Sequence, residues 1–313
     1  MEQIALIPSM NGFGHTRRLL SLGTALREEG FSCTVLVPCQ LLSSVQISTI
    51  VLQKNIDLKT ICSDLYLDGP YSNLQNHQAC ESDFYPEDLH KFLAVISDTL
   101  TWVAEFNSNS ILIAQFTWEK YYDSNFDDKF LNHRLKKFRK ILGLEYFSRK
   151  YLSSQSNFDQ IPLIDYWGLS RYIKTPYSHA IHFLSSGAED ITKLVPKNLL
   201  KKSNLIIYGL ENYLRNNSKP LAAICRPGLG SILECLSSDI VPILLDLPDP
   251  ELSLNRSITL GNNWAISLEE FQDYNIAARI PKLEAFRFNR KLPKVYTPSY
   301  IVKNYILKEI EES

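Results

Sequence analysis

The chain has 313 residues, a formal net charge of −1 and 45% hydrophobic residues. This length is sufficient for two domains of ordinary size, and the apolar content can fill two cores. A net charge so close to zero provides no overall attraction to nucleic acid, so we expect no nucleic-acid partner. The six cysteines are scattered without a CxxC pair, which favours buried thiols in a reducing cytoplasm.

The first residues have the pattern of a strand and not of a targeting segment. No basic region precedes a long apolar core, and no apolar window approaches the roughly 18 residues that a membrane span needs. We therefore expect neither a signal peptide nor a membrane span, and we interpret the chain as a soluble cytoplasmic protein.

The first part of the chain has the alternation of a βαβ unit. The pattern predicts a strand over 4–8, a turn over 11–14, a helix over 16–29 that ends at Gly30, and a strand over 31–37. It further predicts a helix over 88–106 and a buried strand over 110–116. Strands that are apolar throughout are typical of parallel sheets covered on both faces, so the fold class is α/β with a doubly wound sheet.

The alternation of strands and helices restarts after a less regular segment. Residues 117–160 are aromatic and charged and have a helical pattern, and residues 160–175 contain the expected junction. We expect an N-terminal domain over 1–165 and a C-terminal domain over 166–313. The second domain is predicted to contain strands over 180–184, 204–208, 221–225, 241–246 and 264–267, and a helix over 250–260. A final helix over 299–311 can pack back on the first domain.

The segment Arg226-Pro-Gly-Leu-Gly-Ser231 is the most informative part of the chain. A buried strand runs into a Pro/Gly turn, and we expect a helix to open at Gly230-Ser231 with Glu234 on its first turn. Free N–H groups and the helix dipole make such a turn an anion site, and glycines allow a phosphate to approach the backbone. The alternative is an ordinary strand–turn–helix connection with Ser231 as N-cap.

The loop Gly12-Phe-Gly-His15-Thr-Arg17 differs from a dinucleotide-binding fingerprint. Arg17 stands where close helix–sheet packing needs glycine, and the next strand ends without an acidic residue. His15 is the unusual feature, because a neutral imidazole at a helix opening is suited to act as a general base on an alcohol or on water. Alternatively, His15 caps the helix or bonds a neighbouring carbonyl.

Together, the two motifs resemble those of GT-B glycosyltransferases. Gly12-x-Gly14-His15-x-x-Arg, followed by a Leu/Ala-rich helix, is similar to the amino-terminal motif of the branch that contains the peptidoglycan N-acetylglucosaminyltransferase, the UDP-glycosyltransferases and related UDP-sugar hydrolases. The run from Arg226 to Glu234, with 241–245 and 251–255 after it, resembles the donor-binding motif of the same branch. The order and spacing fit over essentially the whole chain. The resemblance implies two Rossmann-like doubly wound domains that face a cleft.

The resemblance also implies roles for individual residues. On the acceptor side, His15 is the candidate base, and the residues expected to bind substrate are Gly12, Gly14, Arg17, Gln115 and Trp118. Trp118 is equally compatible with a buried core aromatic. On the donor side, the expected contacts to diphosphate, ribose and sugar are Ser186, Gly187, Arg226, Gly228, Gly230, Ser231, Glu234, Glu251 and Asn255.

Two positions depart from the family pattern. Leu252 replaces the glutamine that contacts the donor sugar, and Gln115 replaces the aspartate that polarises the catalytic histidine. An amide can orient a ring by hydrogen bonding but cannot stabilise an imidazolium by charge. Asp98 is a candidate substitute, although nothing in the sequence places it near His15.

The expected ligands follow from the same motifs. No Asp-x-Asp motif is present, so we expect no metal, and no cofactor beyond a nucleotide-sugar co-substrate, which we expect to be a UDP-sugar. The acceptor is a glycan, a lipid-linked molecule or a small molecule. Residues 133–151 hold seven Lys/Arg against one Glu and, if helical, form a basic amphipathic surface for contact with the inner face of the membrane. A solvated helix packed on its domain is the alternative.

Three functions compete at this point. The first is a metal-independent glycosyltransferase that inverts the anomeric configuration. The second is a nucleotide-sugar hydrolase or epimerase on the same fold, with His15 activating water. The third is a binding protein that kept the fold without the activity, as Leu252 and Gln115 suggest.

Overall fold

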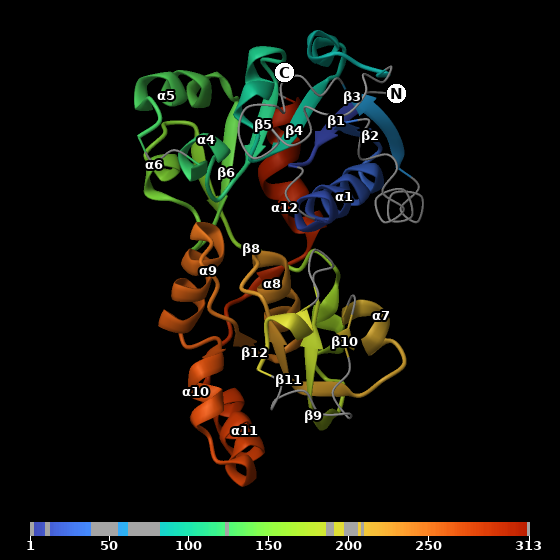
Figure 1. Cartoon of the computed structure of the whole chain (residues 1–313). Helices are drawn as coiled ribbons and strands as arrows, with labels where there is room; N and C mark the ends of the chain where they lie inside the picture. The colour runs from blue at the N-terminus through green and yellow to red at the C-terminus, as the bar shows by residue number, and fades with distance from the viewer. Residues whose placement is uncertain are drawn as a thin grey trace. The chain divides into compact units, whose positions relative to one another are not determined.

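The computed structural model describes residues 3–9, 13–38, 56–61, 82–122, 125–185, 191–196, 206–207 and 210–311. The chain divides into two compact units, Met1–Pro162 together with Pro298–Ser313, and Leu163–Thr297 (Figure 1). Each unit is built on a parallel sheet, and α-helices or 3₁₀ turns lie between most of the successive strands in the described residues, which confirms the α/β class.

The first unit is organised by a seven-stranded sheet with the order β3-β2-β1-β4-β5-β6-β7. All of its strand pairs are parallel. The strands are β1 Gln3–Ile7, β2 Ser32–Pro38, β3 Asp57–Ile61, β4 Ala94–Asp98, β5 Ser110–Ile113, β6 Lys140–Leu144 and β7 Phe158–Ile161. The strand order reverses between β1 and β4, which is where open α/β sheets bind ligands at the carboxyl ends of the strands.

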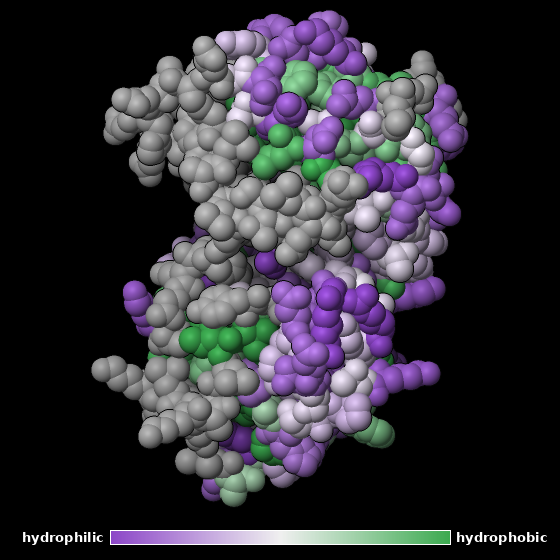
Figure 2. Space-filling view, turned by 90° about the vertical axis from the view of Figure 1, so that its right-hand side faces the viewer, coloured by the Kyte–Doolittle hydropathy of each residue, from purple (hydrophilic) through white to green (hydrophobic). Residues whose placement is uncertain are grey.

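The first unit has one long helix and several short ones. These are α1 Phe13–Glu28, α4 Trp118–Tyr122, α5 Asp128–Lys137, α6 Lys150–Ser153, the 3₁₀ turns Pro86–Lys91 and Thr101–Glu105, and the C-terminal run α12 Pro298–Ile301, π-helix Val302–Ile306 and α13 Leu307–Glu311. The C-terminal run packs beside α1 (Figure 1), where Ser299 Oγ donates to Glu28 Oε2 at 3.1 Å and Lys303 Nζ lies 3.1 Å from Glu29 Oε1. Within the described residues, no helix is long and apolar enough to cross a bilayer, and polar side chains cover much of the surface seen in Figure 2.

The helix predicted over 88–106 is wrong. The segment instead contains a 3₁₀ turn, the central strand β4 and a second 3₁₀ turn. Every residue of β4 is buried, and β4 pairs with β1 on one side and β5 on the other. A short apolar run that is buried on both faces has no periodicity that separates strand from helix, and the β-branched pair Val95-Ile96 fits the strand.

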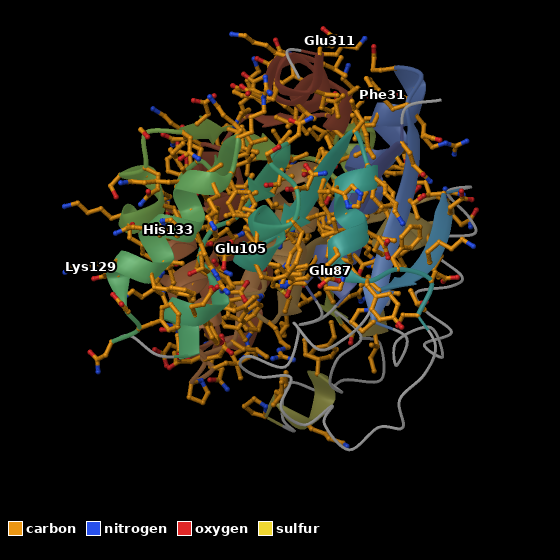
Figure 3. All side chains as sticks on the ribbon, turned by 90° about the horizontal axis from the view of Figure 1, so that it is seen from above. Phe31, Glu87, Glu105, Lys129, His133 and Glu311 are labelled. Carbon is orange, nitrogen blue, oxygen red and sulfur yellow. The ribbon has the colours of Figure 1, made fainter. Side chains whose placement is uncertain are left out.

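The single helix considered over 133–151 is also wrong. Helix α5 ends at Lys137, and β6 begins at Lys140. Most of the apolar side chains of this segment are buried, namely Leu135, Phe138, Ile141, Leu142, Leu144 and Phe147. Exposed side chains of α5, such as Lys129 and His133, lie at the outer edge of the unit in Figure 3. The segment therefore lacks the continuous apolar helix face with which interfacial helices enter a membrane.

The second unit contains a five-stranded parallel sheet with the order β10-β9-β11-β12-β13. The strands are β9 Tyr177–Leu184, β10 Ile206–Ile207, β11 Lys219–Cys225, β12 Val241–Leu244 and β13 Ile266–Ser267, and a separate pair joins β8 Leu163–Ile164 to β14 Val295–Tyr296. The helices are α7 Leu210–Leu214, α8 Leu229–Ser238, α9 Pro250–Gly261, α10 Leu268–Asp273 and α11 Arg279–Asn289. The order reverses between β9 and β11, so the expected ligand edge lies beyond these two strands.

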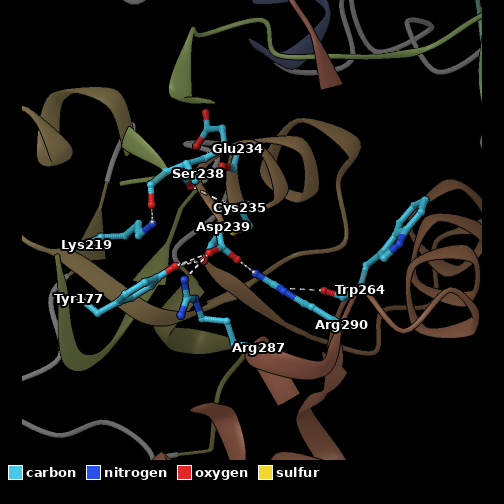
Figure 4. Close-up of polar contacts among 10 residues, drawn as sticks. Tyr177, Lys219, Glu234, Cys235, Ser238, Asp239, Trp264, Arg287 and Arg290 are labelled. Atoms are coloured by element: carbon cyan, nitrogen blue, oxygen red, sulfur yellow. Dashed lines mark hydrogen bonds and ion pairs between the residues drawn. The ribbon is translucent and has the colours of Figure 1, made fainter. Parts of the chain in front are cut away.

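A polar network fixes α11 to the second sheet at the end where β9 begins (Figure 4). Asp239 ends α8 in the left-handed conformation with a φ of 60°. Its carboxylate accepts hydrogen bonds from Tyr177 Oη at 2.7 Å, from Arg290 Nη2 at 2.9 Å and from Arg287. Burial alone would raise the pKa of Asp239, but these hydrogen bonds and the charge of Arg290 lower it overall. The network therefore joins β9, the end of α8 and α11 through an ionised carboxylate.

Lys219 is a buried cation beside this network. Its ammonium donates to the carbonyl of Ile173 at 2.6 Å and lies 4.2 Å from the centroid of the Tyr177 ring. The side chain is fully buried, and this burial lowers the pKa of Lys219 to about 8.

The titration of Lys219 should make folding more favourable as the pH rises above 8. Between a folded pKa of about 8 and the ordinary value of about 10.4, the unfolded chain holds a proton that the folded chain lacks. The free energy of unfolding of the wild type, minus that of Lys219→Met, should therefore increase from pH 8 to 9.5 by at most about 1.4 kcal/mol per pH unit. Urea unfolding at several pH values measures this difference, and a flat difference would contradict the lowered pKa.

Candidate functional site

His15 and Asp98 meet at the point where the strand order of the first unit reverses. His15 lies in the first turn of α1, which follows β1, and Asp98 is the last residue of the neighbouring strand β4. Nδ1 of His15 lies 2.9 Å from Oδ1 of Asp98, and the two residues are only 5% and 1% exposed. The sequence identified His15 as a candidate base, but only the strand order reveals its carboxylate partner.

Arg18 completes this cluster from the next turn of α1. Its guanidinium holds the Asp98 carboxylate by two parallel hydrogen bonds, Nε to Oδ2 at 3.0 Å and Nη2 to Oδ1 at 3.1 Å. Nη2 also lies 2.6 Å from Nδ1 of His15. The sequence analysis expected Arg17 to bind substrate and gave no role to Arg18, the arginine of the motif His15-x-x-Arg, although the spacing of three residues places Arg18 on the same helix face as His15.

The electrostatics of the cluster favour an ionised Asp98. Burial would raise the pKa of Asp98, but the charge of Arg18 and the hydrogen bonds from Arg18 and His15 outweigh it, so the pKa is lowered overall. An ionised carboxylate can only accept hydrogen bonds, so it selects the tautomer of His15 with hydrogen on Nδ1. Nε2 then carries the lone pair that a general base needs.

Thr99 turns the chain directly after Asp98 at a cost in backbone strain. It has a φ of 65°, an uncommon conformation for a β-branched residue, and it is buried. Its backbone N–H donates to the carbonyl of Ile113 at 3.0 Å, and its hydroxyl donates to the carbonyl of Asp98 at 2.6 Å. The strained turn therefore fixes the backbone that carries the carboxylate.

Gln115 lies beyond the end of β5. It occupies the position at which the family pattern has an aspartate, but it does not bind His15. Its side chain is 3% exposed, and neither amide atom has a hydrogen-bond partner within the described part of the chain. Its backbone carbonyl accepts a hydrogen bond from the N–H of Arg149 at 2.8 Å. The carboxylate partner of His15 therefore comes from β4, and the amide of Gln115 is free to contact something else.

Trp118 lies in the core beside His15. It is 4% exposed, and its indole N–H donates to Ser9 Oγ at 2.8 Å. Its ring packs edge-on against Phe116 with centroids 4.8 Å apart, and lies 6.1 Å from the His15 ring. Trp118 was interpreted either as a substrate contact or as a buried core aromatic, and its burial favours the second interpretation. Its ring packs near the ring of His15 and supports the position of that residue.

The other predicted residues of this half-site are less constrained. Gly14 precedes His15 within α1, which begins at Phe13 and not at Thr16 as predicted. A Cβ atom at Gly14 would meet nothing within 4 Å, so no packing contact there requires glycine. Arg17 is partly buried and lies outside the His15–Arg18–Asp98 cluster. Gly12 lies outside the described residues.

In the second unit, α8 opens at the carboxyl end of β11 as the glycine-rich motif predicted. Gly228 is the N-cap, with no side-chain hydrogen bond to the first N–H groups, and the helix begins at Leu229. The alternative with Ser231 as N-cap is therefore wrong, and Ser231 lies in the first turn. The first N–H groups of a helix have no partner within the helix, so the start of this ten-residue helix can attract an anion.

Two side chains flank the start of α8. A Cβ atom at Gly230 would lie 3.6 Å from Cη2 of Trp167, and one at Gly228 would lie 3.9 Å from Cδ2 of Leu252. The sequence reasoning missed Trp167. Its loop is held by Asp165, whose carboxylate accepts hydrogen bonds from the N–H groups of Leu169 and Ser170, each at 2.8 Å.

Glu234 lies one turn deeper in α8 than predicted. Because the helix begins at Leu229, Glu234 belongs to the second turn and not to the first. Its side chain is 6% exposed, and in Figure 4 its carboxylate points away from the Asp239 network.

The remaining donor-side residues lie on α9 and near β11. Asp249 caps α9 by accepting from the N–H groups of Glu251 and Leu252 at 3.0 and 2.9 Å. Asn255 is fully buried, and neither of its side-chain amide atoms has a hydrogen-bond partner among the described residues. Arg226 and Glu251 are partly buried. Ser186 and Gly187 lie outside the described residues.

The described residues contain no group of three or more His, Cys, Asp or Glu side chains that could hold a metal ion.

No family model matches the chain, and no curated protein matches it in sequence. Solved structures do match in fold. UGT2 of Phytolacca americana, in complex with UDP-2-fluoroglucose and pterostilbene, has a TM-score of 0.62 and 12% identity over 99% of this chain and 100% of that one. A Polygonum tinctorium UDP-glucosyltransferase that glucosylates indoxyl has a TM-score of 0.61 and 13% identity over 100% and 99%. The Streptomyces glycosyltransferase SsfS6 has a TM-score of 0.52 and 12% identity over 97% and 99%. The chain has the fold of the GT-B glycosyltransferases.

Asp98→Asn should destabilise the protein by about 3–5 kcal/mol at neutral pH, because it leaves the Arg18 guanidinium buried without a counter-charge. The pKa of Asp98 is lowered in the folded state, so its stabilisation is complete above about pH 4 to 5 and is lost as the pH falls below that range.

Urea unfolding of wild type and variant should therefore show a difference that is constant near neutral pH and shrinks in acid. Asp57→Asn, at an exposed position of β3, is the matched control and should stay within about 0.5 kcal/mol of wild type. A small, pH-independent effect of Asp98→Asn would contradict the ionised carboxylate.

Proposed function

We propose that the chain is a glycosyltransferase that moves a sugar from a nucleoside-diphosphate sugar to an acceptor hydroxyl. The observation that carries the proposal is the contact of 2.9 Å between His15 Nδ1 and Asp98 Oδ1 at the ligand-binding edge of a GT-B fold. A histidine whose one ring nitrogen is oriented by a carboxylate is the arrangement in which the other nitrogen removes a proton from an alcohol.

The proposed reaction is a direct displacement. Nε2 of His15 accepts the proton of the acceptor hydroxyl as its oxygen bonds to the anomeric carbon of the sugar. The bond between that carbon and the diphosphate oxygen breaks, and the nucleoside diphosphate leaves with the electron pair. Displacement from the opposite side inverts the anomeric configuration, and His15 then releases its proton to solvent.

The donor contacts are proposed for the second unit. The N–H groups at Leu229, Gly230 and Ser231 would stabilise the charge on the leaving diphosphate without a metal, with Gly228 allowing close approach. Glu234 would bind the ribose, and Glu251 and Asn255 the sugar hydroxyls. The unpartnered amide of Asn255 supports its assignment, because a buried polar group needs a hydrogen-bond partner.

A UDP-sugar is the proposed donor and a small-molecule or glycan hydroxyl the proposed acceptor. Structures similar in fold include one in complex with UDP-2-fluoroglucose and pterostilbene, and one of an enzyme capable of glucosylating indoxyl. The absence of the expected glutamine, replaced by Leu252, removes one polar contact to the sugar, so the preferred sugar can differ from the usual one.

A nucleotide-sugar hydrolase is the second candidate. His15 is only 5% exposed, which suits a water molecule as nucleophile better than a bulky acceptor. In that case His15 would activate water, and free sugar would appear without any acceptor.

Binding of the nucleotide should stabilise the protein selectively. UDP at about 100 times its dissociation constant should add roughly 2.7 kcal/mol to the free energy of unfolding, and TDP, GDP, ADP and CMP should add less. Glu234→Ala should weaken the response to UDP, whereas Glu284→Ala, at an exposed position of α11, should not. Thermal unfolding measures both, and a folded protein that responds to none of the nucleotides would contradict the donor site.

His15→Ala should lower the turnover number for UDP-sugar by about 10²- to 10⁴-fold, because it removes the general base. Stabilisation by UDP should be unchanged in this variant, because the proposed UDP contacts lie on the second unit. Release of UDP with and without a panel of acceptors separates transfer from hydrolysis. Unchanged turnover in His15→Ala would show that His15 is not the base.

A further inference from the structure

We propose that Arg18 is a positioning residue that keeps Asp98 ionised and oriented, and thereby holds His15 in the tautomer whose Nε2 is free to act as a base. This inference rests on the proposed function and deepens it, because the motif Gly12-x-Gly14-His15-x-x-Arg contains Arg18 without giving it a role.

The geometry shows a cluster built around one carboxylate. Arg18 binds both oxygens of Asp98, at 3.0 and 3.1 Å, and His15 binds the second of these oxygens at 2.9 Å. Arg18, His15 and Asp98 are 7%, 5% and 1% exposed. A buried ion pair contributes little net stability compared with apolar side chains of the same shape. The arrangement is therefore better explained by what it does to His15 than by the stability of the fold.

Arg18 determines whether Asp98 is ionised and can accept the hydrogen of His15 Nδ1. Burial favours the neutral carboxyl group, and the charge of Arg18 is the largest influence in the opposite direction on the pKa of Asp98. An ionised Asp98 accepts the hydrogen of Nδ1. A neutral Asp98 would instead carry a hydrogen that it can donate to Nδ1, which would move the proton of the ring to Nε2 and remove the base.

Arg18 also stands close enough to reverse this choice. Its Nη2 lies 2.6 Å from Nδ1 and can donate to it whenever Nδ1 carries no hydrogen. The full charge on Asp98 is then the feature that keeps the hydrogen on Nδ1. Arg18 therefore supports the base only through Asp98, and once Asp98 is replaced its remaining effect is to donate to Nδ1 and disfavour the base.

Lysine at position 18 would keep the charge and lose the paired hydrogen bonds. An ammonium cannot present two parallel N–H groups to a carboxylate, so Asp98 would remain ionised but less well oriented. Arg18→Lys therefore separates the effect of charge from that of orientation, and we expect it to lie between wild type and Arg18→Met in every measurement.

The first test reads the tautomer of His15 directly and needs no activity. Nitrogen-15 NMR of histidine-labelled protein distinguishes the two ring nitrogens, and His15→Gln assigns the signals among the six histidines. Wild type should carry its hydrogen on Nδ1, and Arg18→Met should show a loss of this tautomer. Arg27→Met, an exposed position on the same helix, is the control and should match wild type. An unchanged tautomer in folded Arg18→Met would overturn the proposal.

The second test is a double-substitution cycle on turnover. Arg18→Met and Asp98→Asn should each lower kcat by about 10- to 100-fold with little change in KM. If Arg18 acts through Asp98, the double variant should be no slower than the slower single variant, within about twofold. Multiplying effects would contradict the proposal, and Arg18→Lys serves where Arg18→Met does not fold. Absence of turnover in wild type would refute the proposed function and leave the tautomer measurement valid.

Discussion

The shared carboxylate of Asp98 is the interaction on which the candidate site depends. It neutralises a buried guanidinium on one side and binds the ring of a histidine on the other, at 2.9 to 3.1 Å. All three groups lie at the point where the strand order of the first sheet reverses. The fold brings together α1 and the end of β4, the strained turn at Thr99 fixes the backbone beside the carboxylate, and Trp118 packs next to the histidine ring.

The candidate site of the second unit consists of backbone N–H groups at the start of α8, whereas that of the first unit consists of side chains. Its sheet also reverses order, between β9 and β11, and α8 opens at that edge without a side-chain cap. The opposite end of α8 is held by Asp239 and its arginine and tyrosine partners. The helix is thus anchored at its C-terminal end, and its first N–H groups have no partner within the helix itself.

Local patterns in the sequence predicted the parts of the fold that they encode. The strand–turn–helix segments at α1, α8 and α9 were identified because turn residues and apolar periodicity act over a few residues. The strand β4 was missed because an apolar run buried on both faces has no distinguishing period. Helices α10 and α11 were also missed, and α11 is anchored through Asp239 by a contact between distant segments.

The same division holds for the candidate site. His15 and Gly230 were found because each lies in a local motif, whereas Asp98 is 83 residues from His15 and is brought to it by strand order alone. Arg18 belongs to the motif that contains His15, but its role was missed because that role depends on Asp98. Gln115 stands where the family pattern has an aspartate, which suggested that His15 has no carboxylate partner. The structure shows that Asp98, at the end of the neighbouring strand β4, is that partner. Trp167 belongs to a loop that no motif marks.

The configuration of the anomeric carbon in the product tests the central claim most directly. Proton NMR of the product made from a UDP-sugar of known configuration and a hydroxyl acceptor reports both transfer and its stereochemistry. Base-assisted direct displacement predicts a glycoside with the configuration opposite to that of the donor. A product with the configuration of the donor, or no glycoside with any acceptor, would contradict the account.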